Sequence, residues 1–193
     1  MSKSKELDII YEDESLICVN KPAGLLTIPD RFNTNAPSVI SILSKQFETV
    51  IPVHRLDKNT SGVVLFAKSA EMHKKMSLLF ENREVAKYYV AIVDGRVVPT
   101  EGIIHAPLAE SMTQRGKMVI NKRGKESTTE YKVITQFKRF AYVSLKLLTG
   151  RMHQIRVHML HIGHPLVVDH LYGNRENLCL SEIKQKRFNI GKF

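Results

Sequence analysis

The segment HRLDKNTSG, residues 54–62, leads directly into an apolar run, VVLFA, at residues 63–67. Because the run is apolar at consecutive positions, it predicts a strand that is covered on both faces, which is typical of a buried central strand. A loop that enters such a strand can hold reactive side chains on a rigid support. Residues 54–62 are therefore the first candidates for reactive groups in this chain.

Asp57 is the candidate reactive group of this loop. Cationic side chains flank it at Arg55 and Lys58, and nearby positive charge favours the ionised form of a carboxyl group. An ionised carboxylate can act as a nucleophile or as a general base. The alternative is a purely structural turn, in which the side chains of Asp57 and Thr60 only bond to backbone amides.

The remaining pattern predicts an α+β fold, with a largely antiparallel, mixed sheet and flanking helices. Ser69 is a typical N-cap, and the apolar residues after it recur at helical spacing. Strands are predicted at residues 8–12, 16–19, 63–67, 87–93, 118–120, 128–137 and 142–148, and helices at residues 39–47, 70–80 and 150–161. The first two strands should form a hairpin. The length of 193 residues and the lack of an evident linker predict a single domain, residues 1–193.

The composition narrows the classes of protein that fit. The two cysteines, Cys18 and Cys179, are far apart and lack a CxxC neighbour, so neither a disulfide scaffold nor a cysteine-based zinc site is expected. The N-terminus shows no secretory signal. The longest apolar run, residues 63–67, is too short to cross a bilayer. We expect a soluble, cytoplasmic monomer.

Positive charge is concentrated in the second half of the chain. The net charge is +10, of which +9 lies in residues 101–193. Such asymmetry favours a polyanionic partner, most commonly nucleic acid. The basic residues form two groups, one in residues 184–187 and one around the strand predicted at residues 118–120. The second group consists of Arg115, Lys117, Lys122, Arg123 and Lys125. A solvated hairpin and a charged tail are the alternative, but together with the asymmetry these residues predict a track for phosphates.

A second informative segment, TGRMHQIRVH, covers residues 149–158. On a helix, Met152 and Met159 belong to one apolar stripe, and Arg156 falls at its edge. An arginine drawn partly into a core needs a carboxylate partner. Asp57 is one candidate for that partner. The alternative is an arginine that lies on the surface and extends its charge into water.

Metal and cofactor chemistry is not expected. The histidines at 153, 158, 161 and 164 do not share one helical face, and no His-Glu-x-x-His pattern accompanies them. Ser61 does not lie in the Gly-x-Ser-x-Gly turn of serine hydrolases. No phosphate-cradling loop and no dinucleotide fingerprint occurs. A metal-dependent hydrolase is therefore disfavoured, and neither a metal nor a nucleotide cofactor is predicted.

Four segments in order together resemble the RluA-type pseudouridine synthases of the RsuA/RluA superfamily. Residues 54–62 match the motif HRLDxxTSG, and residues 20–24, NKPAG, match NKPxG. Residues 87–91, KYYVA, resemble the segment that supplies the active-site tyrosine of the family. Residues 150–158, GRMHQIRVH, continue to DHLYG at 169–173 and resemble its C-terminal motif, with Met152 where threonine is more usual. The resemblance covers about residues 8–180 and implies the fold of that family, with a central cleft.

The resemblance implies that the protein converts uridine in ribosomal or transfer RNA to pseudouridine, without a cofactor. Asp57 would start cleavage of the glycosidic bond, and Arg156 would pair with it. Tyr89 would pack on the uracil and help to remove the proton from carbon 5. Because a stacked base cannot be reached, the uridine must be flipped out; Arg55 would fill the space that it leaves. The other motif residues expected to contact substrate are Lys21, His54, Thr60, Arg151, His153 and Gln154.

Two departures from the family pattern bear on specificity. Only a few residues precede the first predicted strand, so we expect that the N-terminal RNA-binding domain of many relatives is absent. Relatives usually continue beyond the segment at which this chain ends, so it is expected to be either a short or a truncated form. The competing hypothesis is a module of the same fold that binds RNA without isomerising it.

Overall fold

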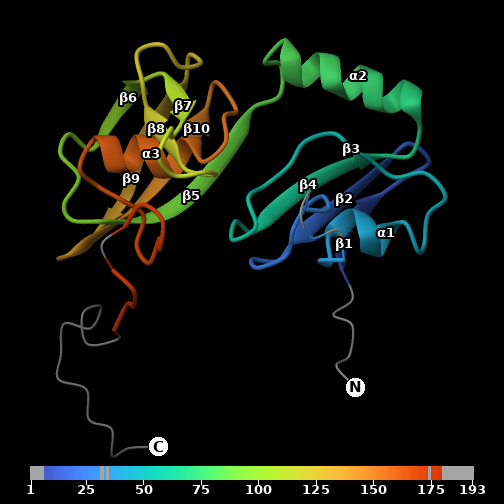
Figure 1. The fold of residues 1–193 in the computed structure, drawn as a ribbon, viewed down its shortest axis with the longest axis horizontal. Coiled ribbons are helices and arrows are strands. Elements are labelled where there is room, and N and C mark those ends of the chain that lie inside the picture. Colours follow the sequence, from blue (N-terminus) through green and yellow to red (C-terminus); the bar gives the residue numbers. More distant parts are fainter. Residues whose placement is uncertain (1–6, 31–32, 34, 174, 180–193) are drawn as a thin grey trace, which may run out of the picture. The chain divides into compact units, whose positions relative to one another are not determined.

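The computed structural model describes residues 7–30, 33, 35–173 and 175–179 of the chain. The chain divides into two compact units, residues 1–85 and 86–193 (Figure 1). Each unit is built on a four-stranded sheet whose paired strands are all antiparallel. The prediction of an α+β fold with a largely antiparallel sheet is confirmed. That both units belong to one catalytic domain stays a prediction.

The first unit contains a sheet with the strand order β1-β2-β4-β3. Its strands are β1 (Asp8–Glu12), β2 (Leu16–Lys21), β3 (Ile51–Pro52) and β4 (Gly62–Ala67). The predicted hairpin is confirmed as β1 and β2. The apolar run at residues 63–67, which follows the loop of residues 54–62, forms β4, an interior strand between β2 and β3. Val64 and Phe66 on it are fully buried, whereas Val63 is 52% exposed, so the strand is covered on both faces only in part.

Two helices complete the first unit. In α2 (Ala70–Glu81), the side chain of Ser69 accepts a hydrogen bond from the amide of Met72, as the N-cap prediction required. This helix packs against β3 and β4. The helix α1 (Val39–Leu43) is shorter than predicted, and the chain continues in turns, with the amide of Phe47 still bonded to the carbonyl of Leu43.

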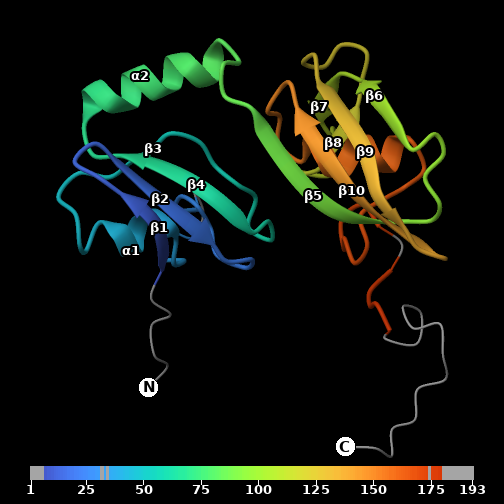
Figure 2. The same ribbon diagram turned by 180° about the vertical axis from the view of Figure 1, so that it is seen from behind.

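The second unit contains a sheet with the order β5-β10-β9-β6 and a small hairpin of β7 and β8. The strands are β5 (Lys87–Asp94), β6 (Glu101–His105), β7 (Leu108–Glu110), β8 (Met118–Ile120), β9 (Thr128–Gln136) and β10 (Phe140–Leu147). The helix α3 (Gln154–His161) lies in front of the sheet in Figure 1 and behind it in Figure 2, so it covers one face.

The core of the second unit lies between this sheet and α3. Val93 of β5, Leu145 of β10 and Met159 of α3 are fully buried in one cluster. The strand predicted at residues 87–93 is confirmed as β5, and its side chains alternate between the two faces, since Tyr89 packs against this cluster and Tyr88 is 66% exposed. Throughout the described part of the chain, no helix is both long and apolar enough to cross a membrane.

The helix predicted at residues 150–161 begins only at Gln154. His153, which precedes it, has a left-handed backbone with φ of 54°, a conformation that cannot continue a right-handed helix. Met152 therefore lies outside the helix and is 38% exposed, so its assignment to the apolar stripe was wrong. Ile155 and Met159 do face the core.

Candidate active site

The loop that carries Asp57 is fixed by Thr27 on its N-terminal side. The hydroxyl of Thr27 accepts a hydrogen bond from the amide of Leu56 at 3.1 Å and donates one to its carbonyl at 3.0 Å. Thr27 is 2% exposed, so these bonds are shielded from water. One buried side chain thus satisfies both backbone groups of the residue before Asp57.

The other side of Asp57 is fixed by the fully buried Lys21. Its Nζ donates to three backbone carbonyls, those of Pro22 (3.0 Å), Leu25 (2.7 Å) and Lys58 (3.1 Å). The amide of Gly24, a residue with φ of +86°, donates to the same carbonyl of Lys58 at 2.9 Å. The positive φ of Gly24 suits glycine, because other residues rarely adopt it. Both neighbours of Asp57, Leu56 and Lys58, are therefore held in place.

The charge of Lys21 interacts with that of Asp57. Burial lowers the pKa of Lys21, and the attraction of the Asp57 carboxylate acts in the opposite direction. The predicted contact of Lys21 with substrate stays a prediction, and the structure adds an internal role for this lysine, under the loop.

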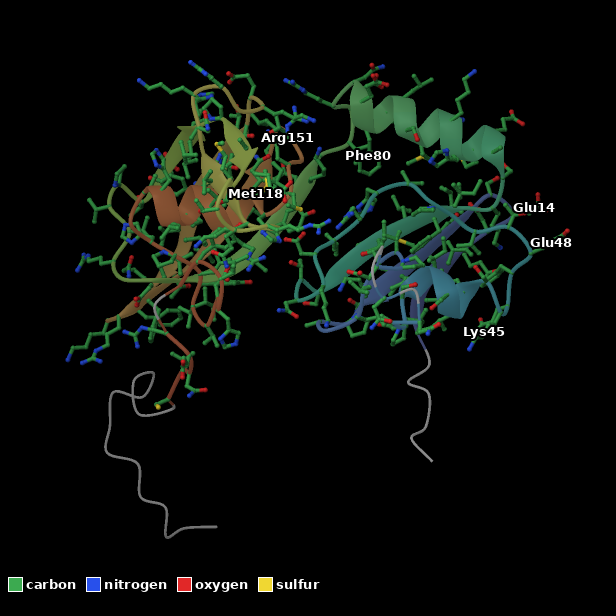
Figure 3. All side chains as sticks on the ribbon, in the orientation of Figure 1. Glu14, Lys45, Glu48, Phe80, Met118 and Arg151 are labelled. Atoms are coloured by element: carbon green, nitrogen blue, oxygen red, sulfur yellow. The ribbon has the colours of Figure 1, made fainter. Side chains whose placement is uncertain are left out.

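The remaining candidates of the first unit lie on the same loop. His54 is half-buried; its Nε2 accepts the amide of Leu65 at 3.2 Å, and its ring stacks on Phe80 of α2, which is labelled in Figure 3, with centroids 5.0 Å apart. The amide of Thr60 donates to the carbonyl of Asp57 at 3.1 Å, so the backbone forms a turn here. Arg55 is exposed. The substrate contacts of these residues stay predictions.

We expect Thr27→Val to lower the free energy of unfolding by about 2 kcal/mol, because the amide and carbonyl of the buried Leu56 lose their partner. Urea unfolding followed by circular dichroism measures this change. Thr27→Ser keeps the hydroxyl and should recover most of the loss. Equal stability of wild type and Thr27→Val would show that these bonds do not hold the loop.

In the second unit, Arg156 of α3 forms a bidentate ion pair with Asp169. Its Nε and Nη2 donate to the two carboxylate oxygens, each at 2.7 Å. The side chain of Arg156 is 21% exposed and that of Asp169 only 5%. The expectation that a partly buried Arg156 has a carboxylate partner is confirmed, with a partner from the basic half of the chain. The pairing of Arg156 with Asp57, which belongs to the other unit, stays a prediction.

The surroundings of Asp169 keep it ionised. Its burial acts to raise the pKa of the carboxyl group, but the hydrogen bonds from Arg156 and from the amides of Leu171 and Tyr172 outweigh burial and hold the pKa below its ordinary value. The ring of Tyr172 lies under the guanidinium of Arg156, 4.7 Å from its Cζ, a geometry that favours a cation–π interaction.

Tyr89 lies in the middle of β5, opposite Leu145 of β10. It is half-buried and shares the inward face of β5 with Ala91 and Val93. An aromatic ring in this position is supported by rigid strands on the sheet, but its contact with a base stays a prediction.

The other motif residues of this unit make internal contacts. Arg151, labelled in Figure 3, lies between β10 and α3 and donates from Nε to the carbonyl of Glu126 at 3.2 Å. His153 places its Nδ1 2.8 Å from the hydroxyl of Tyr172. Gln154 is 2% exposed and bonded through both ends of its amide. The predicted contacts of these three residues with substrate stay predictions.

His158 is fully buried and bonded on both ring nitrogens. Its Nε2 donates to the carbonyl of Ala106 at 2.9 Å, and its Nδ1 lies 2.9 Å from the hydroxyl of Thr129. Since a carbonyl can only accept, Nε2 carries a proton. Burial is the main cause that lowers the pKa of His158 below its ordinary value of 6.5.

We expect this histidine to make the unfolding free energy depend on pH. Below pH 6.5 the unfolded chain gains a proton at His158 that the folded chain does not, so its contribution is complete above pH 6.5 and is lost as the pH falls toward the lowered folded pKa. Urea unfolding between pH 7.5 and 5.5 should show a slope of up to about 1.4 kcal/mol per pH unit. His158→Gln should flatten that slope and His170→Gln, at an exposed position, should not; equal slopes in both would contradict this role.

The predicted phosphate track lies at the two ends of β8. Arg115 and Lys117 precede this strand, and the turn 121–125 follows it. The turn is held by a pair of backbone bonds between Leu108 and Lys125, at 2.8 and 2.9 Å. Gly124 is required there, because a Cβ at this position would lie 2.5 Å from the carbonyl of Leu108. The predicted basic residues 184–187 lie outside the described residues.

The cationic side chains of this hairpin are mostly at the surface. Arg115, Lys122, Arg123 and Lys125 are exposed, and Lys117 is half-buried with its Nζ 5.8 Å from the ring centroid of Tyr172. Within the described ranges, His, Cys, Asp and Glu residues do not gather into a group of three or more that could hold a metal ion.

The sequence did not reveal roles for Thr27, Asp169 and Tyr172. Asp169 and Tyr172 belong to the segment DHLYG that follows the arginine motif, but nothing in the sequence assigned a role to either residue. Thr27 had no signal of its own, because its partner Leu56 lies 29 residues away.

Comparisons with known proteins agree on one family. A family model described as RNA pseudouridylate synthase matches residues 15–161. The chain is 40% identical over 177 residues to the dual-specificity RNA pseudouridine synthase RluA of Salmonella typhi, covering 91% of this chain and 81% of that one. It is 39% identical over 180 residues to the ribosomal large subunit pseudouridine synthase D of Pseudomonas aeruginosa, covering 91% and 56%. The chain thus spans little more than half the length of the latter.

A solved structure is similar as well. The human RNA pseudouridylate synthase domain containing 1 superposes with a TM-score of 0.76 at 28% sequence identity. The match covers 91% of this chain and 73% of that chain.

Proposed function

Because this chain belongs to the RNA pseudouridylate synthase family, we propose that it isomerises uridine in RNA to pseudouridine. Ribosomal or transfer RNA in the cytoplasm is the proposed substrate; the names of the similar proteins refer to the ribosomal large subunit and to RNA. The single observation that carries the proposal is Asp57 on a loop whose two flanking residues are both fixed by buried side chains.

The proposed reaction exchanges one bond of the ribose for another. The bond between carbon 1′ and nitrogen 1 of uracil breaks, the base turns, and carbon 1′ bonds to carbon 5. Carbon 5 loses its proton and nitrogen 1 gains one, so no atom is gained or lost overall and no electron acceptor is needed. The protein must therefore supply a group that starts cleavage of the glycosidic bond, a base for one proton and a place in which the freed uracil can turn.

The proposed roles follow from these needs. Asp57 acts on the ribose and starts cleavage of the glycosidic bond, and Arg156 keeps that carboxylate ionised and oriented. Tyr89 packs on the uracil and takes part in removal of the proton from carbon 5. Arg55, which is exposed, occupies the space left by the flipped nucleotide, where a planar guanidinium can stack between bases.

The support for this assignment is preorganisation. A nucleophile contributes most when its direction is fixed before the substrate binds. Thr27 and Lys21 fix Leu56 and Lys58, so the backbone of Asp57 is held from both sides at the entrance to β4. This is the arrangement expected of a catalytic loop on a rigid strand.

The cationic hairpin is proposed to bind the RNA backbone. Changing Lys122, Arg123 and Lys125 to glutamine should make RNA binding less dependent on salt, with the slope of log Kd against log salt reduced by about 0.7 to 0.9 for each phosphate that the variant no longer neutralises. Filter binding at several salt concentrations measures the slope. Changing the exposed Lys45, Lys74 and Lys75 to glutamine removes the same charge and should leave the slope nearly as it is; equal changes in both would contradict a localised track.

Tritium release from RNA labelled at carbon 5 of uridine tests the proposed function. Each turnover at a labelled uridine frees its tritium to water, so the wild-type protein should release label catalytically. Tight binding of RNA without release would favour the module that binds RNA without isomerising it.

A further inference from the structure

The carboxylate of Asp169 is held rigidly in its place. It accepts four hydrogen bonds: from Nε of Arg156 at 2.7 Å, from Nη2 of Arg156 at 2.7 Å, from the amide of Leu171 at 3.0 Å and from the amide of Tyr172 at 3.2 Å. The two amides belong to the turn that carries Asp169 itself. The carboxylate therefore cannot follow Arg156 if that side chain moves, and it acts as a fixed anchor.

The guanidinium of Arg156 also packs against an aromatic ring. The ring of Tyr172 lies 4.7 Å from Cζ of Arg156. That ring is immobile, because its hydroxyl accepts the amide of Met118 at 2.7 Å and lies 2.8 Å from Nδ1 of His153. Hydrogen bonds to Asp169 and the contact with this ring thus hold the guanidinium from two sides.

The backbone next to Asp169 is strained. Val168 has φ of 60°, which is a true outlier for a β-branched residue. Strain of this kind persists only where the surroundings impose it, and it gathers at functional sites. His153, which contacts Tyr172, is also left-handed, so two strained residues border the same small network.

We propose that Asp169 is a positioning residue that fixes the direction of the Arg156 guanidinium for the catalytic role proposed for that arginine. A guanidinium carries five N–H groups, and Asp169 engages two of them along one edge, which fixes the direction of the other N–H groups. The proposal rests on the proposed function, since the catalytic role of Arg156 comes from there. An ion pair kept only for stability would gain little over apolar residues at this site, whereas fixing the direction of a catalytic arginine requires a carboxylate.

The test compares kcat and KM of wild type and Asp169→Asn in tritium release. Asparagine keeps the size of the side chain, but its amide nitrogen cannot accept a hydrogen bond, so one of the two bonds to Arg156 is lost. We expect kcat to fall about 10- to 100-fold, the range produced by a misplacement of about 1 Å, while KM changes less than about threefold. Asp94→Asn is the matched control, because Asp94 pairs with Arg175 at 3.3 Å in the same unit and should keep the wild-type kcat.

A double variant separates positioning from a general structural effect. In the background of Arg156→Ala, Asp169→Asn should cause little further loss of kcat, because there is no guanidinium left to aim. An undiminished loss in that background, or an unchanged kcat in Asp169→Asn alone, would overturn the proposal. Thermal unfolding by circular dichroism confirms that each variant is folded.

A measurement that needs no activity keeps this proposal distinct from the proposed function. In the ¹⁵N–¹H spectrum, the Nε–H signal of Arg156, assigned by its loss in Arg156→Lys, should be sharp and slow to exchange in wild type. Asp169→Asn should broaden it or speed its exchange, and an unchanged signal would overturn the proposal. If wild type released no tritium, the proposed function would fail, and this signal would still decide whether Asp169 holds Arg156.

Discussion

Asp57→Asn is expected to abolish tritium release, with a rate at least about 10⁴-fold below wild type. Asparagine has nearly the size of aspartate, so the turn from Asp57 to Thr60 and the bonds of Thr27 and Lys21 should remain. What is lost is the negative charge and the ability to attack the ribose or accept its proton. Effects of this size are typical when a nucleophile is removed.

The control for this prediction is a carboxylate of the same unit that has no role in the proposed mechanism. Asp8 of β1 accepts a hydrogen bond from the side chain of Asn20 at 3.0 Å at an exposed position. Asp8→Asn should retain wild-type release. Substantial release by Asp57→Asn, with the protein folded and RNA bound as in wild type, would remove Asp57 from the mechanism.

Gln154→Leu is expected to produce the largest loss of stability among the motif residues, about 3 kcal/mol. The amide of Gln154 forms four hydrogen bonds: with the hydroxyl of Thr149 (2.8 Å), the amide of Arg151 (3.0 Å), the carbonyl of Thr128 (3.0 Å) and the hydroxyl of Thr129 (2.9 Å). Leucine fills the same space but leaves the hydroxyl proton of Thr149 and the amide of Arg151 without this acceptor. Each such group costs about 1–3 kcal/mol.

Thermal unfolding measures this effect. For a chain of this length, 3 kcal/mol corresponds to a decrease in Tm of about 10 °C. Gln114→Leu is the matched control, because Gln114 is exposed in the loop before β8, and its Tm should change little. A Tm of Gln154→Leu within about 2 °C of wild type would show that the buried network does not hold α3 to the sheet.

Local signals allowed much of the fold to be predicted. The predictions of the cap at Ser69, the hairpin of β1 and β2 and the strand β5 depend on neighbours in sequence, and all three are confirmed. The strands β6 and β7 were missed, because Gly102 and Pro107 interrupt the apolar pattern around them. The reason for Gly102 lies far along the chain, since a Cβ there would lie 2.9 Å from the hydroxyl oxygen of Tyr131 and 3.0 Å from its ring.

The start of α3 shows why some local predictions fail. Residues 150–153 fit a helical pattern, but the side chain of Gln154 bonds to Thr149 and to the amide of Arg151. These bonds hold the preceding chain in a turn that ends at His153, and the same glutamine reaches β9 at Thr128 and Thr129. Contacts made across the unit thus outweigh helical spacing.

The sequence allowed the candidate site residues to be predicted, but not the residues that hold them in place. The motif around Asp57 and the half-buried character of Arg156 could be seen in the sequence. The clamp of Thr27 on Leu56 and that of Asp169 on Arg156 join residues 29 and 13 positions apart. Such pairs depend on how the turns place them, and neither charge nor periodicity along the chain indicates them.

The most direct measurement of the central claim is nucleoside analysis of RNA after incubation with the protein. Chromatography of the digested RNA should show pseudouridine appearing in the same molar amount as uridine disappears, with wild type and not with Asp57→Asn. That equality is the signature of an isomerisation. RNA that is bound but keeps all of its uridine, or pseudouridine formed equally by Asp57→Asn, would contradict the account.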